Sequence, residues 1–348
     1  MALTRAPAST NVRCVPPGAT SDAGRRTGVA LCLVSAVGFG LMAIFAKEAY
    51  AAGLGVTALL AARFVLAACL LWALVAVRAR RGGADAGPAR PPRRVVLAGL
   101  ALGAIGYAAQ AGLFFSALRH IDVSLTSLLL YTYPALVFCG AVALRREHVT
   151  PYKALALLLA SAGAALVLLG GSTGGLEATG VALALGAGAA YAAYILVAEG
   201  VVARIDAFLL GALVATGAAT TFVVAGLIGG ALAFPAGGWI WIVAIALFST
   251  VLPIIAFMMG MERVGAASAS ILSTVEPVVT VGLAVAIYSE ALGPPQILGG
   301  VLVLAAVVAL QARGTRALRP AVGSARGAAA HPADPAPARA AACEPARG

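Results

Sequence analysis

The sequence contains few charged residues for its length. Only 11% of its 348 residues are Asp, Glu, Lys or Arg, against about 25% in a typical soluble domain. Hydrophobic residues make up 61% of the chain, and the mean hydropathy is +0.99. So few charges cannot cover the surface of a water-soluble globule. The composition also excludes a disordered chain and a collagen-like fibre, and it therefore predicts an integral membrane protein.

The sequence also lacks the residue clusters that metal sites and common enzymes require. The three histidines (His120, His148 and His331) are scattered and form no HExxH pair. Neither a GxSxG elbow nor a Gly-rich phosphate loop occurs. The five cysteines show neither metal-binding nor redox spacing. These absences argue against a membrane-embedded enzyme, and the sequence implies no cofactor and no metal.

Long apolar runs, in contrast, are abundant. A helix that crosses the hydrocarbon core needs about 20 apolar residues. Runs of this kind cover residues 28–46, 54–77, 95–118, 121–144, 152–170, 181–199, 207–230, 239–261, 265–288 and 295–311. We therefore predict an all-α membrane protein with ten transmembrane helices. Small residues four apart, such as Gly99 and Gly103, predict close helix packing. The polar ends, 1–27 and 312–348, are predicted to be disordered cytoplasmic tails.

The basic residues are distributed asymmetrically between these runs. If the N-terminus is cytoplasmic, all but three of the 24 Lys and Arg residues fall on the cytoplasmic side or in the tails. Only Lys47 and Arg119 fall on the outer side, and Arg63 lies inside a run. Cytoplasmic loops carry an excess of Lys and Arg, so both termini are predicted to be cytoplasmic, in the plasma (bacterial inner) membrane. The net charge of +11 is too scattered to indicate nucleic-acid binding.

The chain repeats itself at a constant offset. The equivalent pairs are Ser127 and Ser270, Pro134 and Pro277, Glu147 and Glu290, and Pro151 and Pro294. This offset makes the fourth and ninth runs equivalent, as well as the fifth and tenth. Because five helices are an odd number, the second half must be inverted in the membrane, as in many secondary transporters. The predicted halves are residues 28–170 and 181–311, joined by an external linker at 171–180.

These features resemble the EamA-type branch of the drug/metabolite transporter superfamily. The matching residues are Ala46-Lys47, Arg63-Phe64, Glu276-Pro277, Glu147 and Glu290. The resemblance implies transport of small metabolites through a central cavity between the halves, with the last helix of each half at the periphery. It implies no particular substrate.

Two charges lie deep inside predicted spans. Arg63 and Glu276 both fall within a few ångströms of the middle of a hydrocarbon core of ~30 Å. A charge at that depth needs a partner or a polar cavity. They are expected either to contact the substrate from a cavity wall or to form a static internal ion pair.

Further polar residues in the runs are expected to line the same cavity. They are Tyr107, Gln110, Ser127, Tyr131, Ser270 and Thr274. For the serines and threonines, hydrogen bonds between helices are the main alternative to substrate contact.

Pro134 and Pro277 are predicted to be mid-helix hinges. Each deprives the carbonyl four residues earlier, on Leu130 or Ser273, of its helical donor. Inside a membrane that carbonyl requires another partner. Glu147 and Glu290 are each predicted to cap the helix that follows, near Pro151 or Pro294.

The sequence therefore predicts a secondary transporter that exports a small polar metabolite, such as an amino acid, by alternating access. The predicted partners are a small-molecule substrate and the lipid bilayer. The alternative substrate class is a cationic drug, and a channel or a membrane enzyme is disfavoured. Proton coupling through Glu276 and facilitated diffusion both stay open, as does the oligomeric state.

Overall fold

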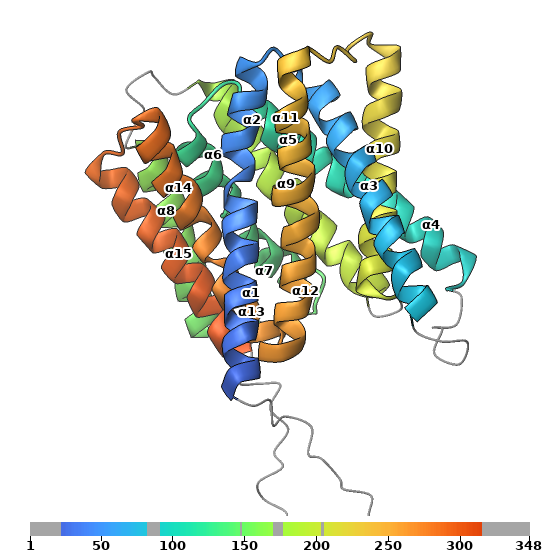
Figure 1. The fold of residues 1–348 in the computed structure, drawn as a ribbon. Helices are drawn as coiled ribbons and strands as arrows, with labels where there is room; N and C mark the ends of the chain where they lie inside the picture. Colours follow the sequence, from blue (N-terminus) through green and yellow to red (C-terminus); the bar gives the residue numbers. More distant parts are fainter. Residues whose placement is uncertain (1–21, 82–90, 147, 170–176, 203–204, 315–348) are drawn as a thin grey trace, which may run out of the picture.

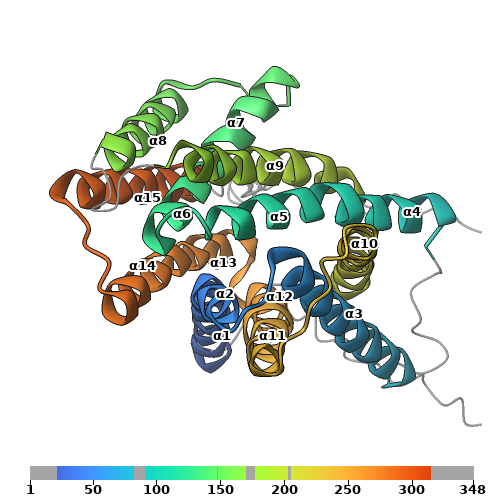
Figure 2. The same ribbon diagram turned by 90° about the horizontal axis from the view of Figure 1, so that it is seen from above.

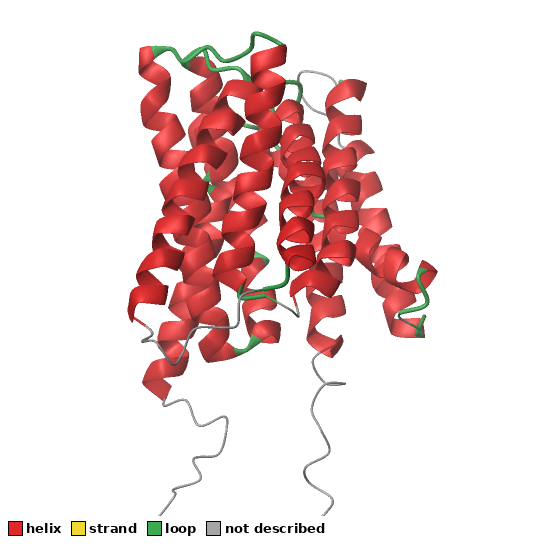
Figure 3. Cartoon of the chain, turned by 90° about the vertical axis from the view of Figure 1, so that its right-hand side faces the viewer, coloured by secondary structure: helices red, strands yellow, loops and turns green. Residues whose placement is uncertain are grey.

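The computed structural model describes residues 22–81, 91–146, 148–169, 177–202 and 205–314, and all its regular secondary structure there is helical (Figure 3). The first half contains α1 (Asp22–Gly40), α2 (Met42–Ala51), α3 (Val56–Arg81), α4 (Arg93–Ala101), the π-helix η1 (Leu102–Tyr107), α5 (Ala108–Ala117), α6 (Val123–Leu130), α7 (Tyr133–Ala143) and α8 (Pro151–Leu169). The second half contains α9 (Ala178–Val202), α10 (Ala207–Ile228), the 3-10 helix η2 (Ala236–Gly238), α11 (Trp239–Ala246), the π-helix η3 (Leu247–Val251), α12 (Leu252–Val264), α13 (Ala266–Ser273), α14 (Val275–Tyr288) and α15 (Pro294–Gly314).

Over the described ranges, nine helical stretches are long and apolar enough to cross a membrane. They are Ala23–Ala51, Val56–Arg80, Arg93–Ala117, Val123–Ala143, Pro151–Leu169, Ala178–Val201, Ala207–Ile228, Ala236–Val264 and Ser268–Tyr288. The tenth predicted span corresponds to α15, whose apolar part, Pro294–Ala309, is shorter. The all-helical membrane fold is confirmed, and the count of ten crossings stays a prediction.

The helices extend beyond the apolar runs at several ends. The helix α1 begins at Asp22, inside the predicted N-terminal tail, and α9 begins at Ala178, inside the predicted linker. The helix α15 continues to Gly314, inside the predicted C-terminal tail. Hydropathy marks only the part of a helix that lies in hydrocarbon, so polar terminal turns are missed. The rest of the tails (1–21 and 315–348) and residues 171–176 of the linker lie outside the described residues.

Helices of the two halves pack against each other in a symmetric way. The helix α3 packs on α10, α8 on α15, α1 on α12, and α5 on α9 (Figures 1 and 2). Exchanging each helix for its equivalent in the other half reproduces the same set of pairs. This pattern is expected of two halves related by a two-fold axis.

Both halves interrupt their helices at equivalent places. The third membrane helix of each half contains a π-helical segment, η1 or η3. The fourth breaks between α6 and α7, and again between α13 and α14. The prediction that Pro134 and Pro277 lie in the middle of a helix is therefore wrong, since each lies in the first turn of a second helix. A first turn tolerates proline because its N–H groups have no intrahelical acceptor.

The close approach predicted for small residues is confirmed at one crossing. A side chain on Gly103 would overlap the backbone of Val214 in α10, and one on Gly217 would overlap the backbone of Leu100 in α4. The two backbones touch here because neither glycine carries a β-carbon.

Candidate functional site

A cavity of about 140 Å³ lies where the two halves meet. Its walls come from α1, α2, α3, η1, α5, α6 and α7 of the first half and from α9 and α14 of the second. A larger cavity of about 420 Å³ adjoins it. The two share Phe39, Tyr107, Tyr131, Tyr133, Tyr191 and Glu276.

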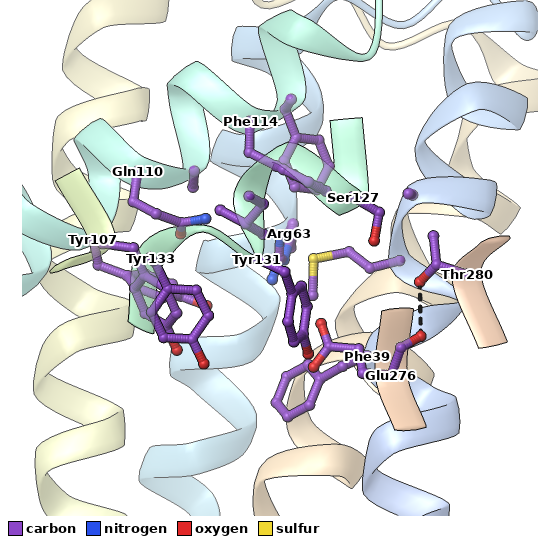
Figure 4. A pocket seen from close by; sticks show the side chains of 16 residues that line it. Phe39, Arg63, Tyr107, Gln110, Phe114, Ser127, Tyr131, Tyr133, Glu276 and Thr280 are labelled. Carbon is purple, nitrogen blue, oxygen red and sulfur yellow. Dashed lines mark hydrogen bonds between the residues drawn. The ribbon is translucent and has the colours of Figure 1, made fainter. Parts of the chain in front are cut away.

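The structure brings the eight predicted site residues onto these walls. Six of them line the smaller cavity and are labelled in Figure 4: Arg63, Tyr107, Gln110, Ser127, Tyr131 and Glu276. Ser270 and Thr274 line the larger one. The two nearest the expected hinges, Tyr131 and Thr274, are the residues at which the broken helices are interrupted. Their role in binding substrate stays a prediction.

Arg63 is 1% exposed and is surrounded by the side chains of Thr250, Phe64, Phe115 and Tyr107. Its Nε donates a hydrogen bond to Thr250 Oγ1 at 2.9 Å. Its Cζ lies 4.9 Å from the centre of the Phe64 ring and 5.2 Å from that of Phe115, within the range of cation–π attraction. Its Nη2 is buried and has no hydrogen-bond partner among the described residues.

Glu276 lies in the first turn of α14, which is the second part of the broken ninth span. Its carboxylate lies beside the Tyr131 hydroxyl (Figure 4). The Thr280 hydroxyl donates to the Glu276 carbonyl at 3.1 Å and to the Gly40 carbonyl at 3.0 Å, and so anchors this turn to α1. Although Glu276 and Arg63 face the same cavity, they form no ion pair. Both residues are predicted from the sequence to lie near the middle of the membrane, with a static ion pair between them as one alternative. The structure does not contain this ion pair.

The Ser273 carbonyl cannot accept a helical hydrogen bond from Pro277, which has no N–H group. It accepts a hydrogen bond from Tyr131 instead. The Tyr131 hydroxyl, from the break in the first half, donates to the Ser273 carbonyl at 3.4 Å. This long, weak hydrogen bond links the two helix breaks across the cavity.

Five tyrosines form a continuous cluster along the cavity walls. The ring centroids of Tyr131 and Tyr133, Tyr133 and Tyr191, Tyr191 and Tyr194, and Tyr194 and Tyr107 lie 4.6–6.1 Å apart. The sequence reasoning missed several lining residues, namely Phe39, Tyr133, Tyr191, Tyr194 and Thr250. The spacing of Tyr191 and Tyr194, three apart on one helical face, was an available signal.

Glu290 caps a different helix from the one predicted. Its two carboxylate oxygens accept the backbone N–H groups of Val123 at 2.9 Å and Ser124 at 3.0 Å, in the first turn of α6. The prediction that it caps the following helix, near Pro294, is wrong, because the orphan N–H groups of α6 lie within reach across the interface between the halves. Glu147, its equivalent, lies outside the described residues.

Asp122 precedes the same turn and lies near Glu290. Partial burial, together with the like charge of Glu290, raises the pKa of the Asp122 carboxyl, while Lys47 acts in the opposite direction. The first turn of α6 thus has Glu290 as its capping carboxylate, while Asp122 makes no side-chain cap.

Replacing Glu290 by alanine is expected to lower the free energy of unfolding by about 1–2 kcal/mol, because two N–H groups lose a charged acceptor. Thermal unfolding of the purified protein in detergent measures the loss. Glu199→Ala is the control, because Glu199 forms an exposed ion pair with Arg146 at 3.1 Å, and such pairs contribute about 0–1 kcal/mol. Equal effects of the two substitutions would contradict the capping role.

Comparison with known proteins identifies the family to which this fold and cavity belong. The sequence profile of the EamA-like transporter family matches residues 26–169 and, a second time, residues 178–311. The chain belongs to the EamA-like transporter family. The two matches fall on the two halves that the internal repeat indicates.

Other similar proteins agree with this membership. The uncharacterized transporter YcbK of Bacillus subtilis (strain 168) is 28% identical over 291 residues, which cover 78% of this chain and 88% of YcbK. A solved crystal structure shares the fold with a TM-score of 0.60 at 18% identity, over 84% of this chain and 99% of the other. The family and the relative are described as transporters, so membrane transport is the general activity indicated for this EamA-like protein.

Proposed function

We propose that the protein exports a small polar metabolite, such as an amino acid, across the cytoplasmic membrane by alternating access. The observation that carries the proposal is a cavity between the halves that holds one charge of each sign, Arg63 and Glu276, not paired with each other. A buried charge without a counter-charge is costly. A zwitterionic solute offers a counter-charge to both at once, which a purely cationic solute does not.

The proposed architecture is ten spans in two inverted halves, 28–170 and 181–311, with an external linker at 171–180. The symmetric helix pairs and the equivalent π-helical segments support it. In Figure 1, α1 begins and α15 ends at the same edge of the bundle, as an even number of crossings requires. The excess of Lys and Arg on that side supports a cytoplasmic location for this edge.

The arrangement of the cavities supports loading from the cytoplasm. The larger cavity is lined by Ala207 and Leu210, in the first turns of α10, near the proposed cytoplasmic end. At the opposite end, the Tyr288 hydroxyl donates to Glu48 Oε1 at 2.8 Å, and Glu290 caps α6. These contacts tie the halves together on the outer side, with Pro134 and Pro277 proposed as the hinges that let them separate.

The proposed topology predicts which loops a membrane-impermeant thiol reagent reaches. Single cysteines placed at 78–94 in a background without other cysteines are expected to react only from the cytoplasmic side. Cysteines at 171–180 are expected to react only from outside, because an odd number of spans separates the two segments. Labelling of both segments from the same side would contradict the ten-span arrangement.

The tyrosine cluster favours cationic drugs as the second substrate class. Tyr131, Tyr133 and Tyr191 line the cavities together with Glu276, and aromatic rings beside a carboxylate bind organic cations. Of these three tyrosines, only Tyr131 was among the residues predicted from the sequence to line the cavity.

Transport into proteoliposomes tests both classes. The probes are radiolabelled L-amino acids and the lipophilic cation tetraphenylphosphonium, each with and without a pH gradient. We expect amino-acid transport above that of protein-free liposomes, and its dependence on the gradient distinguishes proton coupling from facilitated diffusion. Transport of the lipophilic cation without that of any amino acid would reverse the order of the two candidates. Single-channel currents in a planar bilayer would instead indicate a channel.

A further inference from the structure

Arg63 lines the smaller cavity, and its Nη2, which carries two N–H donors, has no hydrogen-bond partner among the described residues. Its Nε is engaged by Thr250, and its guanidinium lies near the rings of Phe64 and Phe115. The Tyr107 hydroxyl also lies beside the guanidinium, but the buried Nη2 makes no hydrogen bond within the described residues. A buried, charged donor without an acceptor is destabilising, and it is therefore expected to be satisfied by something that enters the cavity.

Thr250 sets the direction in which this donor points. Thr250 is buried within the π-helical segment η3, and its hydroxyl donates to the Ile245 carbonyl, five residues earlier, at 2.9 Å. A hydroxyl has one donor and two acceptor lone pairs. With its hydrogen committed to Ile245, Thr250 can only accept from Arg63. The π-helical turn thereby fixes the guanidinium, and π-helical turns of this kind are frequent at functional sites.

We propose that Arg63 Nη2 is the subsite for a carboxylate of the transported solute and that Thr250 is the residue that positions it. This inference rests on the proposed function and assigns one end of its substrate. The planar guanidinium matches the geometry of a carboxylate better than that of a spherical ion. The Gln110 amide and the Tyr107 hydroxyl add uncharged polar groups to the same cavity. The opposite charge, Glu276, is left to receive the cationic end of the solute.

The test compares each amino acid with its own amide, which lacks the negative charge but keeps the amine. The melting temperature of the purified wild-type protein in detergent is titrated with the twenty L-amino acids and their amides. We expect at least one acid to stabilise the protein with an affinity about tenfold or more above that of its amide, because the lost bond is charge-assisted. If no acid is preferred to its amide, the carboxylate subsite is refuted.

Variants of the π-helical turn test the positioning role. Thr250→Val keeps the shape of the side chain but loses the acceptor, and it is expected to reduce the preference for acid over amide to about threefold or less. Thr250→Ser keeps the hydroxyl and the preference. The control is Ser249→Ala, which removes from the same turn a buried hydroxyl with no hydrogen-bond partner among the described residues. If Thr250→Val weakens acids and amides equally, Thr250 has only a structural role.

Two further arms separate the remaining outcomes. Sodium chloride alone is the probe for an inorganic anion. If chloride stabilises the wild-type protein as much as the amino acids do, and Thr250→Val abolishes this stabilisation, the site is not specific for carboxylates and the assignment is overturned. Uptake of the same acids and amides into proteoliposomes separates the subsite from the function. If acids and amides are transported equally, the carboxylate subsite is refuted but the proposed transport function is supported. Selective binding of acids without any transport supports the subsite and refutes the proposed function.

Discussion

Replacing Arg63 by alanine is expected to lower transport by at least about 30-fold, because a buried charge that pairs with substrate contributes about 2 kcal/mol or more. The protein is nevertheless expected to insert and fold. Removing the guanidinium also removes the cost of holding a charge out of water, and Thr250 keeps its bond to Ile245. Initial rates in proteoliposomes, normalised to the amount of folded protein, measure the effect.

The matched control is Arg78→Ala in the same helix. Arg78 lies near the C-terminal end of α3, outside the cavity, with its Cζ 4.3 Å from the centre of the Phe208 ring. The Arg78→Ala substitution should leave the transport rate within about threefold of that of the wild type, since cation–π contacts at exposed sites contribute about 0.5–1 kcal/mol.

The double substitution separates two interpretations of the central charges. If Arg63 and Glu276 formed a static pair, Glu276→Gln would partly rescue Arg63→Ala by neutralising the stranded charge. Because the two residues form no ion pair, we expect no rescue of transport or of stability. A double variant with clearly better activity than Arg63→Ala would show that they pair in a functional state.

Replacing Gly103 by valine is expected to abolish the folded state or to destabilise it by about 3 kcal/mol or more. A new β-carbon overlaps the backbone of Val214, and backbone cannot yield as a flexible side chain does, so the cost lies at or above the top of the usual 1–3 kcal/mol for overpacking. Gel filtration of the detergent-extracted protein and its melting temperature measure the loss.

Gly282→Val is the control for this substitution. Gly282 also lies within a helix, α14, but a β-carbon there meets no atom within 4 Å. Its cost should be a few tenths of a kcal/mol at most, since valine has at least the helix propensity of glycine. If both variants are equally stable, the crossing of α10 with the third membrane helix is not as tight as described.

The sequence predicted the membrane helices and most polar lining residues for a simple physical reason. A polar residue inside an apolar run stands out, and the cost of placing Arg63 or Glu276 in lipid requires a polar cavity. Depth, however, fixes only the level of a residue along the membrane normal. It does not fix rotation about the helix axis, so it could not decide whether the two charges pair.

The missed features depend on geometry that a sequence pattern does not encode. Thr250 lies in the π-helical segment η3, whose i→i+5 hydrogen bonds change which side chains share a face of the helix. No residue type in the sequence predicts such a segment. Glu290 was assigned to the nearest helix in sequence, although its acceptor oxygens serve a helix 167 positions away. Aromatic residues in apolar runs look like packing residues until neighbouring helices bring them together, as with Tyr191 and Tyr194.

The position of the Glu290 cap has a consequence for biogenesis. The ribosome synthesises the first turn of α6 long before it reaches Glu290, which follows Val123 by 167 residues. At about 5–20 residues per second, roughly 10–30 s pass during which the first N–H groups of α6 have no capping carboxylate. A nascent chain released before residue 290 never acquires one. The first turn of α6 is therefore completed only after every described helix except α15 has been synthesised.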